Sequence, residues 1–276
     1  MNALEIRGLT KRRGDFALQG LDLTLPAGCI MGLIGENGAG KSTTIRLVLN
    51  GLRRDGGTIA VYGKDNRALT ALEREDISVV LDEVGLPEYM NAQQIGCMMA
   101  GIFTRWQPEV YRDYLRRLAL PEDKPFKDFS RGMRMRLGLA AALSHQPKLL
   151  LLDEATSGLD PVVRDDILTI LSDFTRNEEH AVLISSHIVS DLEKVCDYVV
   201  FLHKGRLLLC EEKDRLTEEY GILRGTTEGI EPAAVCGQRA TPYGTEYLVR
   251  RSAVPAGVPL GQVNIEDLFV FMAKEA

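Results

Sequence analysis

The stretch Gly35-Glu36-Asn37-Gly38-Ala39-Gly40-Lys41-Ser42-Thr43 decides the fold, because it matches every fixed position of the phosphate-binding pattern G-x-x-x-x-G-K-S/T. Such a loop turns tightly and brings its backbone N–H groups close to phosphate oxygens, where a Cβ in place of its glycines would obstruct them. We therefore expect this loop to bind a nucleoside triphosphate. The nucleotide-binding residues predicted in it are Gly35, Asn37, Gly38, Ala39, Gly40, Lys41, Ser42 and Thr43.

The residues on either side of the loop support this interpretation. Before the loop, residues 29–34 are short and apolar like a buried strand, and residues 40–50 behind it are typical of a packed helix. The N-terminus of that helix points its positive end at a bound anion. Lys41 is placed to reach the β- and γ-phosphates, and Ser42 to hold Mg²⁺. The alternative, a glycine-rich turn without a ligand, is disfavoured by the order of strand, loop and helix.

Composition limits the class of protein. The chain has 276 residues, of which 45% are hydrophobic, enough for one large α/β domain and a small addition. The net charge is −6 and no long Lys/Arg block occurs, so we expect no nucleic-acid partner. The scattered cysteines lack metal-ligand spacing, which favours free thiols in a reducing cytosol. Without a signal peptide or an apolar run of about 18 residues, we expect the chain neither to span a membrane nor to be exported.

Apolar runs predict an α/β architecture with an antiparallel portion at its start. Strands are expected at residues 3–7, 16–25, 29–34, 58–62, 77–81, 148–152, 181–185, 198–203 and 206–211. Between residues 91 and 144 the pattern becomes helical, with helices expected at 93–103, 108–119 and 131–143.

The same pattern divides the chain into two parts. Residues 1–212 form the expected nucleotide-binding domain, with a helical insert at about 84–144. Residues 213–276 form a small accessory domain that is punctuated by Gly and Pro. We expect this accessory domain to begin with a helix at 213–220 and to end with an amphipathic helix near 264–274.

A second motif, Lys148-Leu149-Leu150-Leu151-Leu152-Asp153-Glu154, ends a leucine-rich strand in two carboxylates. The carboxyl ends of parallel strands are where ligands bind in open α/β sheets. Asp153 would hold Mg²⁺, directly or through water, and Glu154 is suited to polarise a water for attack on the γ-phosphate. Such a strand is common alone, but together with the glycine-rich loop it predicts triphosphate hydrolysis.

A third motif, Phe129-Ser130-Arg131-Gly132-Met133, opens the helix expected at 131–143, with Ser130 as its N-cap. A helix N-terminus that carries a Ser hydroxyl and a Gly N–H can hold a γ-phosphate. Taken alone, the pattern is more often an ordinary cap.

These motifs are followed by Ala155-Thr156-Ser157-Gly158-Leu159-Asp160-Pro161 and by Ser185-Ser186-His187. In this order they resemble those of an ATP-binding cassette (ABC) ATPase, over about residues 3–212. The resemblance implies an α/β P-loop NTPase core with an antiparallel β subdomain and a helical subdomain insert, to which this chain adds a small C-terminal α+β appendage. It also implies ATP and Mg²⁺ as cofactors.

The resemblance assigns roles to individual residues. Ser130 and Gly132 match the signature motif, which contacts the ATP held by the opposite subunit. Asp160 belongs to the loop that communicates across that interface, and His187 matches the switch histidine that touches the γ-phosphate. The active site would then need a second ABC ATPase, as a homodimer or a heterodimer. Its catalytic residues would be Glu154, His187 and Lys41.

Two positions depart from the family's pattern. Asp82 stands where the family usually has a glutamine that ligates Mg²⁺ and senses the membrane partner, and we expect it to be a metal ligand together with Ser42 and Asp153. Arg13 stands where an aromatic ring normally stacks on adenine. Its guanidinium can stack instead, and Phe16 is the other candidate. Adenine selectivity is therefore less determined than triphosphate binding.

We interpret the chain as the ATPase subunit of an ABC transporter, at the cytoplasmic face of a membrane with separate integral-membrane permease subunits. The S-R-G-M signature, Asp82-Glu83 and the appendage resemble bacterial exporter ATPases of the antibiotic-resistance and acetoin-utilisation type, which favours export. The permease would dock on residues 84–106, unless the apolar side chains there form the core of the insert. Those side chains are Met90, Met98, Met99, Ile102, Phe103 and Trp106.

Two other classes are considered. A soluble ABC ATPase that transports nothing, for example of the iron–sulfur assembly type, is the alternative function. A small-molecule kinase with the same loop would have no reason to keep the motifs at 130–133 and 157–160. The sequence does not name a transported substrate, because substrate contacts would lie in another polypeptide.

Overall fold

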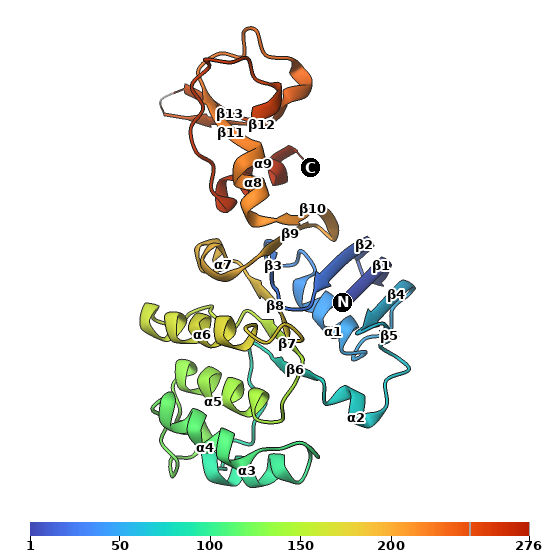
Figure 1. Cartoon of the computed structure of the whole chain (residues 1–276), viewed down its shortest axis with the longest axis vertical. Coiled ribbons are helices and arrows are strands. Elements are labelled where there is room, and N and C mark those ends of the chain that lie inside the picture. Colours follow the sequence, from blue (N-terminus) through green and yellow to red (C-terminus); the bar gives the residue numbers. More distant parts are fainter. Residues whose placement is uncertain (243, 276) are drawn as a thin grey trace.

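The computed structural model describes residues 1–242 and 244–275, and its centre is a six-stranded sheet of order β10-β9-β3-β8-β7-β6 (Figure 1). The strands are β3 (Ile30–Ile34), β6 (Ile77–Val80), β7 (Leu149–Asp153), β8 (Ala181–Ser186), β9 (Tyr198–His203) and β10 (Arg206–Glu212). The edge strand β10 is antiparallel to β9, and the other pairs are parallel. Every residue of β3, β7 and β8 is buried, as expected for parallel strands covered on both faces.

This sheet separates two hydrophobic cores. In β7, Leu149 and Leu151 belong to one core, whereas Leu150 and Leu152 belong to the other, as the period of two in a strand requires. The first core is covered by α1 (Lys41–Val48) and the second by α5 (Arg131–Leu143), α6 (Pro161–Phe174) and α7 (Val189–Val195). The nucleotide-binding motifs therefore follow strands that are held from both sides.

A second, antiparallel sheet of order β2-β1-β4-β5 lies over the core that contains α1. It consists of β1 (Asn2–Arg13), β2 (Phe16–Pro26), β4 (Gly56–Val61) and β5 (Lys64–Asp65), and the short helix α2 (Ala71–Arg74) follows. Ile6, Leu23 and Ile59 of this sheet share their core with Met31 of β3. The expected antiparallel start of the chain is confirmed.

The helical insert lies between β6 and β7 at one end of the molecule (Figure 1). It contains α3 (Ala92–Ala100), α4 (Pro108–Arg117), a 3-10 turn (Phe126–Asp128) and α5. The bounds predicted for α5 are confirmed, but α3 and α4 are shorter than expected. Gly101 stands at the C-cap of α3, and α4 ends before Ala119, whose φ of 49° is left-handed and cannot continue a helix.

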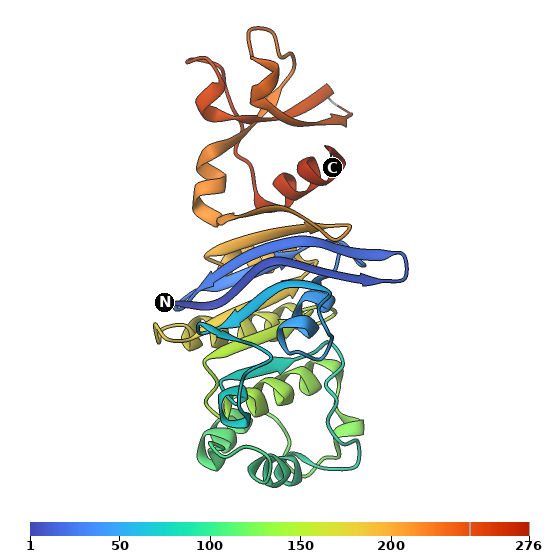
Figure 2. The same ribbon diagram turned by 90° about the vertical axis from the view of Figure 1, so that its right-hand side faces the viewer.

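The C-terminal unit occupies the opposite end of the molecule (Figure 2). Its sheet, of order β11-β13-β12, lies between α8 (Lys213–Glu219) and α9 (Ile265–Glu275) in the chain. It contains β11 (Tyr220–Arg224), β12 (Val235–Thr241) and β13 (Gly244–Arg250), with 3-10 turns at Pro232–Ala234 and Arg251–Ala253. Both helices agree with the sequence-based expectation to within one residue at each end, whereas the expected α+β appendage was given no strand positions.

The last helix, α9, folds back onto the ATP-binding part of the chain. The ring of Phe269 meets that of Phe201 in β9 edge-on, with 5.5 Å between centroids. The backbone N–H of Ile265 donates to Glu193 Oε1 of α7 at 2.5 Å. Within residues 1–242 and 244–275, no helix is both long and apolar enough to cross a membrane.

Because Leu150 is fully buried in the larger core, Leu150→Ala should lower the free energy of unfolding by about 2–5 kcal/mol. Urea denaturation monitored by the fluorescence of the single tryptophan, Trp106, measures this change. Leu72→Ala is the control, because Leu72 is 57% exposed and its loss should change stability by less than about 0.5 kcal/mol. Equal effects of the two variants would contradict the assignment of Leu150 to a packed core.

Candidate functional site

The phosphate-binding loop joins β3 to α1, and its glycines are required by close contacts. A Cβ on Gly35 would lie 2.3 Å from the carbonyl oxygen of Leu202, which is backbone and cannot yield easily. Gly40 has a φ of 113°, and a Cβ there would lie 2.8 Å from the ring of Phe16. Other residue types would therefore distort the loop that the sequence pattern identified.

The ammonium group of Lys41 is the buried charge of the site, with 5% of its side chain exposed. Its Nζ donates to the carbonyl oxygen of Gly35 at 2.7 Å and to that of Glu36 at 3.3 Å. It also lies 3.0 Å from Glu154 Oε1. A triphosphate at this loop would meet a cation that is already oriented by the loop itself.

Three oxygen-bearing side chains meet at the end of β7. Ser42 Oγ donates to Asp153 Oδ1 at 3.1 Å, and Ser185 Oγ of β8 donates to the same oxygen at 2.7 Å. Adjacent oxygens around an octahedral Mg²⁺ lie about 2.9 Å apart, because each is about 2.0–2.1 Å from the ion. Ser42 and Asp153 therefore fit two neighbouring positions of such an ion, which in nucleotide sites takes further ligands from phosphates and water.

Glu154 is held by its backbone as well as by its side chain. Its φ of 54° is left-handed, which is unfavourable for a residue other than glycine. Its backbone N–H donates to Ser185, to the carbonyl oxygen at 3.1 Å and to Oγ at 3.0 Å. Its Oε2 lies 2.6 Å from His187 Nδ1. The turn thereby directs the carboxylate towards Lys41 and His187 instead of along β7.

A cavity of about 430 Å³ lies over the loop. The residues that line it are Arg13, Phe16, Glu36, Asn37, Gly38, Gly40, Lys41, Ser42, Thr43, Asp82, Asp153 and Glu154. Most of the residues predicted for nucleotide and metal binding are therefore brought together here. Gly35 and Ala39 belong to the loop but do not line the cavity. Ala39 is 3% exposed, and Gly35 packs on Leu202.

Three of the predicted residues form a separate group beside this cavity. Ser130 caps α5 by accepting from the N–H of Met133 at 3.3 Å, and Asp160 caps α6 by accepting from the N–H of Val163 at 3.1 Å. A Cβ on Gly132 would lie 3.6 Å from Val163, so the starts of the two helices are in contact. Ser130, Gly132 and Asp160 are not among the residues that line the nucleotide cavity.

Two side chains at the site received no role from the sequence. Ser185 belongs to the quoted Ser185-Ser186-His187 motif, and its hydroxyl links Asp153 to the backbone of Glu154. Arg131 belongs to the quoted signature, and its Nη2 lies 2.5 Å from Asp82 Oδ1. In both cases the residue lay inside a recognised motif, but its partner is distant in sequence.

The fold and the site together define a P-loop nucleotide hydrolase. A family model described as "ABC transporter" matches residues 18–157. An uncharacterized ABC transporter ATP-binding protein, YhcH of Bacillus subtilis (strain 168), is 32% identical over 93% of this chain and 87% of its own length. The chain belongs to the ABC transporter family, as an ATP-binding and ATP-hydrolysing protein.

Further relatives agree with this assignment. The bacitracin transport ATP-binding protein BcrA of Enterococcus faecalis is 31% identical over 74% of this chain and 68% of its own. The daunorubicin/doxorubicin resistance ATP-binding protein DrrA of Streptomyces peucetius is 36% identical over 75% of this chain and 64% of its own. A solved structure of an ATP-binding subunit of an ABC transporter superposes with a TM-score of 0.70, at 25% identity, over 78% of this chain and 91% of that one.

Because a Cβ on Gly35 would collide with a backbone oxygen, Gly35→Ala should weaken MgATP binding at least about tenfold while the domain still melts cooperatively. Isothermal titration calorimetry gives the affinity, and a thermal melt tests the fold. Gly51→Ala is the matched control, because a Cβ there would lie 3.5 Å from the nearest atom, in ordinary contact. Wild-type affinity in Gly35→Ala would rule out the close packing of the loop on β9.

Proposed function

We propose that the chain hydrolyses MgATP to drive a separate membrane permease that exports its substrate, as a peripheral subunit on the cytoplasmic face of the membrane. The observation that carries the hydrolytic part is the contact of Glu154 with both Lys41 and His187, beside the Ser42–Asp153 oxygen pair. Export is supported by the relatives described as bacitracin transport and daunorubicin/doxorubicin resistance proteins.

The residues of the cavity divide the chemistry between them. A bound Mg²⁺ would neutralise charge that develops on the phosphates. Lys41 exchanges Glu154 for the β- and γ-phosphates, which releases a carboxylate that can orient and deprotonate the attacking water. His187, from the end of β8, keeps contact with that carboxylate and with the γ-phosphate. Arg13 or Phe16, on the wall of the cavity, contacts the base, and Asp82 as a third metal ligand stays a prediction.

The second half of the active site is supplied by another ABC ATPase subunit, either a second copy or a different chain. Ser130 and Gly132, at the start of α5, are not among the residues that line their own nucleotide cavity, and Gly132 lies next to Val163 of α6 instead. Asp160, at the start of α6, lies beside them. In a facing pair, this group meets the triphosphate of the other subunit.

Glu154→Gln should keep ATP binding but lower hydrolysis by at least about 100-fold, since the amide cannot accept the proton of the water. Size-exclusion chromatography with MgATP should then show a dimer that persists, whereas the wild-type chain returns to the monomer. Glu178→Gln is the control, because Glu178 is an exposed acid outside the cavity. Hydrolysis by Glu154→Gln at the wild-type rate would eliminate Glu154 as the base, and a monomer at all ATP concentrations would contradict the proposed pairing.

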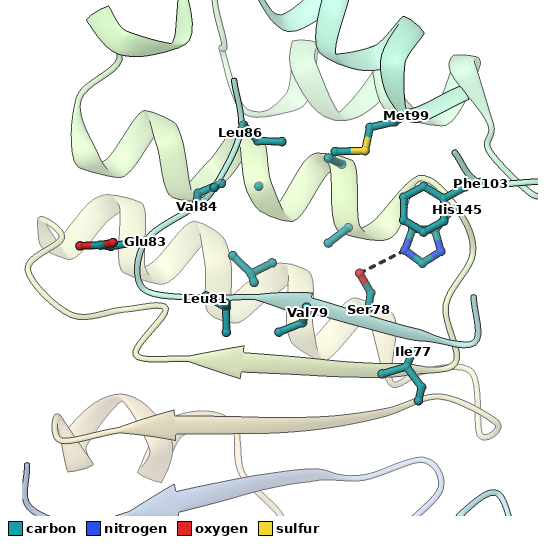
Figure 3. Close-up of a pocket in the computed structure, with 15 residues that line it drawn as sticks. Ile77, Ser78, Val79, Leu81, Glu83, Val84, Leu86, Met99, Phe103 and His145 are labelled. Atoms are coloured by element: carbon teal, nitrogen blue, oxygen red, sulfur yellow. Dashed lines mark hydrogen bonds between the residues drawn. The ribbon is translucent and has the colours of Figure 1, made fainter. Parts of the chain in front are cut away.

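The permease docks at an apolar cavity of about 300 Å³ between β6, the segment after it, α3 and α5 (Figure 3). Val84 and Leu86 form one wall, and Met99 and Phe103 form another, with Glu83 at the edge. The segment after β6 lines both cavities, because Leu81 and Glu83 line this one and Asp82, between them, lines the nucleotide cavity. An apolar side chain from a partner helix fits this site.

A buried histidine closes the far end of this cavity (Figure 3). The ring of His145 stacks on that of Phe103 with 4.0 Å between centroids, and its Nε2 lies 3.1 Å from Ser78 Oγ. Burial lowers the pKa of His145, which favours the neutral ring and keeps this end of the cavity uncharged. An apolar anchor is therefore a better occupant than an acidic one.

The apolar side chains expected to receive the permease are not all in one place. Met99 and Phe103 line the cavity. Trp106 lines a different groove, between α3 and α4, and Ile102 is 60% exposed on the surface. Met90 packs against the main core. The expected residues are thereby divided among the docking cavity, the groove between α3 and α4, the core and the exposed surface.

Met99→Glu should leave the basal ATPase rate within about twofold but abolish stimulation by the permease, because it places a charge in the wall of the apolar cavity. The measurement compares ATPase activity with and without the membrane protein encoded beside this gene, in lipid vesicles. Ile102→Glu is the matched control, since this exposed side chain lies outside the cavity. Equal loss in both variants would refute docking at this cavity, and the lack of any neighbouring membrane protein would favour the non-transport alternative.

A further inference from the structure

The nucleotide cavity carries more negative than positive charge. Of the described residues that line it, four are acidic (Glu36, Asp82, Asp153 and Glu154) and two are basic (Arg13 and Lys41). A triphosphate is itself an anion, so each uncompensated carboxylate on the wall opposes its binding. The site can bind ATP well only if these acids are neutralised or turned away.

Three of the four acids are already accounted for. Asp153 accepts from two hydroxyl groups and provides an oxygen suited to Mg²⁺. Glu154 is paired with Lys41. Glu36 is the most exposed of the four acids, with 63% of its side chain exposed against 51% for Asp82, so water screens its charge most. Asp82 is the remaining acid.

Asp82 is neutralised by a residue that lies outside the cavity. Arg131, the first residue of α5, places Nη2 2.5 Å from Asp82 Oδ1. Arg131 does not line the nucleotide cavity; it lines the adjacent one, on the other side of Asp82. The cation therefore approaches the carboxylate from behind, and the wall presented to a nucleotide is close to neutral.

The backbone around Arg131 leaves room for its side chain. A Cβ on Gly158 would lie 2.7 Å from Arg131 Nη1, and Gly158 has a left-handed φ of 66°. The guanidinium is thus bounded by Asp82 on one side and by the loop after β7 on the other. Both members of the pair are 51% exposed, so the pair adds little to the stability of the fold. Its effect is on the charge of the cavity.

We infer that Arg131 determines nucleotide affinity by masking the charge of Asp82. It acts through Asp82 and needs no contact with the nucleotide of its own subunit. Removal of Arg131 leaves the negative charge of Asp82 uncompensated beside the phosphates. If Asp82 carries no charge, Arg131 is no longer needed for ATP affinity. The inference concerns ATP binding alone, so it does not depend on the proposed permease or on dimerisation.

The test is a double-mutant cycle on the full chain, with ATP affinity measured by isothermal titration calorimetry in EDTA, where hydrolysis and Mg²⁺ are both eliminated. Arg131→Ala should bind ATP about three- to tenfold more weakly. Asp82→Asn should bind ATP as tightly as the wild type or up to about threefold more tightly. The double variant should return to within about twofold of the wild type, and 0.5 M NaCl should reduce the loss in Arg131→Ala.

Controls separate charge from structure. Arg131→Lys keeps the cation and should bind like the wild type, while Arg131→Gln keeps hydrogen bonding without charge and should reproduce the loss. Arg116→Ala removes an exposed cation of the same insert, which pairs with Asp113 of the same helix, and should have no effect. A double variant as weak as Arg131→Ala alone would overturn the inference. A loss of ATP affinity in Arg131→Ala that is seen with Mg²⁺ but not in EDTA would also overturn it. That result would mean that Arg131 holds Asp82 in place as a metal ligand instead of masking its charge.

Discussion

The ion pair between Lys41 and Glu154 is the interaction on which the geometry of the site depends. It joins the start of α1 to the end of β7, and through His187 it reaches the end of β8. A buried ammonium group needs compensation, and here the compensating carboxylate is Glu154, which we propose as the catalytic base. In the proposed mechanism, nucleotide binding and release of the base are therefore one exchange of partners at Lys41.

The local part of this site could be predicted from the sequence. Ser42 and Lys41 follow a short apolar strand, and Asp153 follows four leucines, so period and spacing alone place their side chains at one edge of a parallel sheet. Pairing of β3 with β8 and of β8 with β7 then brings His187 to Glu154. Motifs at the carboxyl ends of adjacent parallel strands lie close together because these ends share one edge of the sheet.

Contacts between segments far apart in the chain could not be predicted in this way. Asp82 and Arg131 are 49 residues apart, and no periodicity relates them. The division of the apolar insert residues between cavity and core depends on how α3 crosses α4 and α5. The strands β12 and β13 were missed because few of their residues are buried, so they lack the apolar alternation that identifies a strand.

The C-terminal unit packs against the ATP-binding sheet, although the sequence pattern divides the chain into residues 1–212 and 213–276. Ile265, Leu268 and Phe271 of α9 are fully buried in the same core as Leu192 and Phe201. A polypeptide that stopped at residue 212 would expose the part of this core that α9 covers, next to Leu192 and Phe201. The C-terminal unit therefore shields part of the hydrophobic core of the ATP-binding domain from water. The two domains should consequently unfold in one cooperative transition instead of separately.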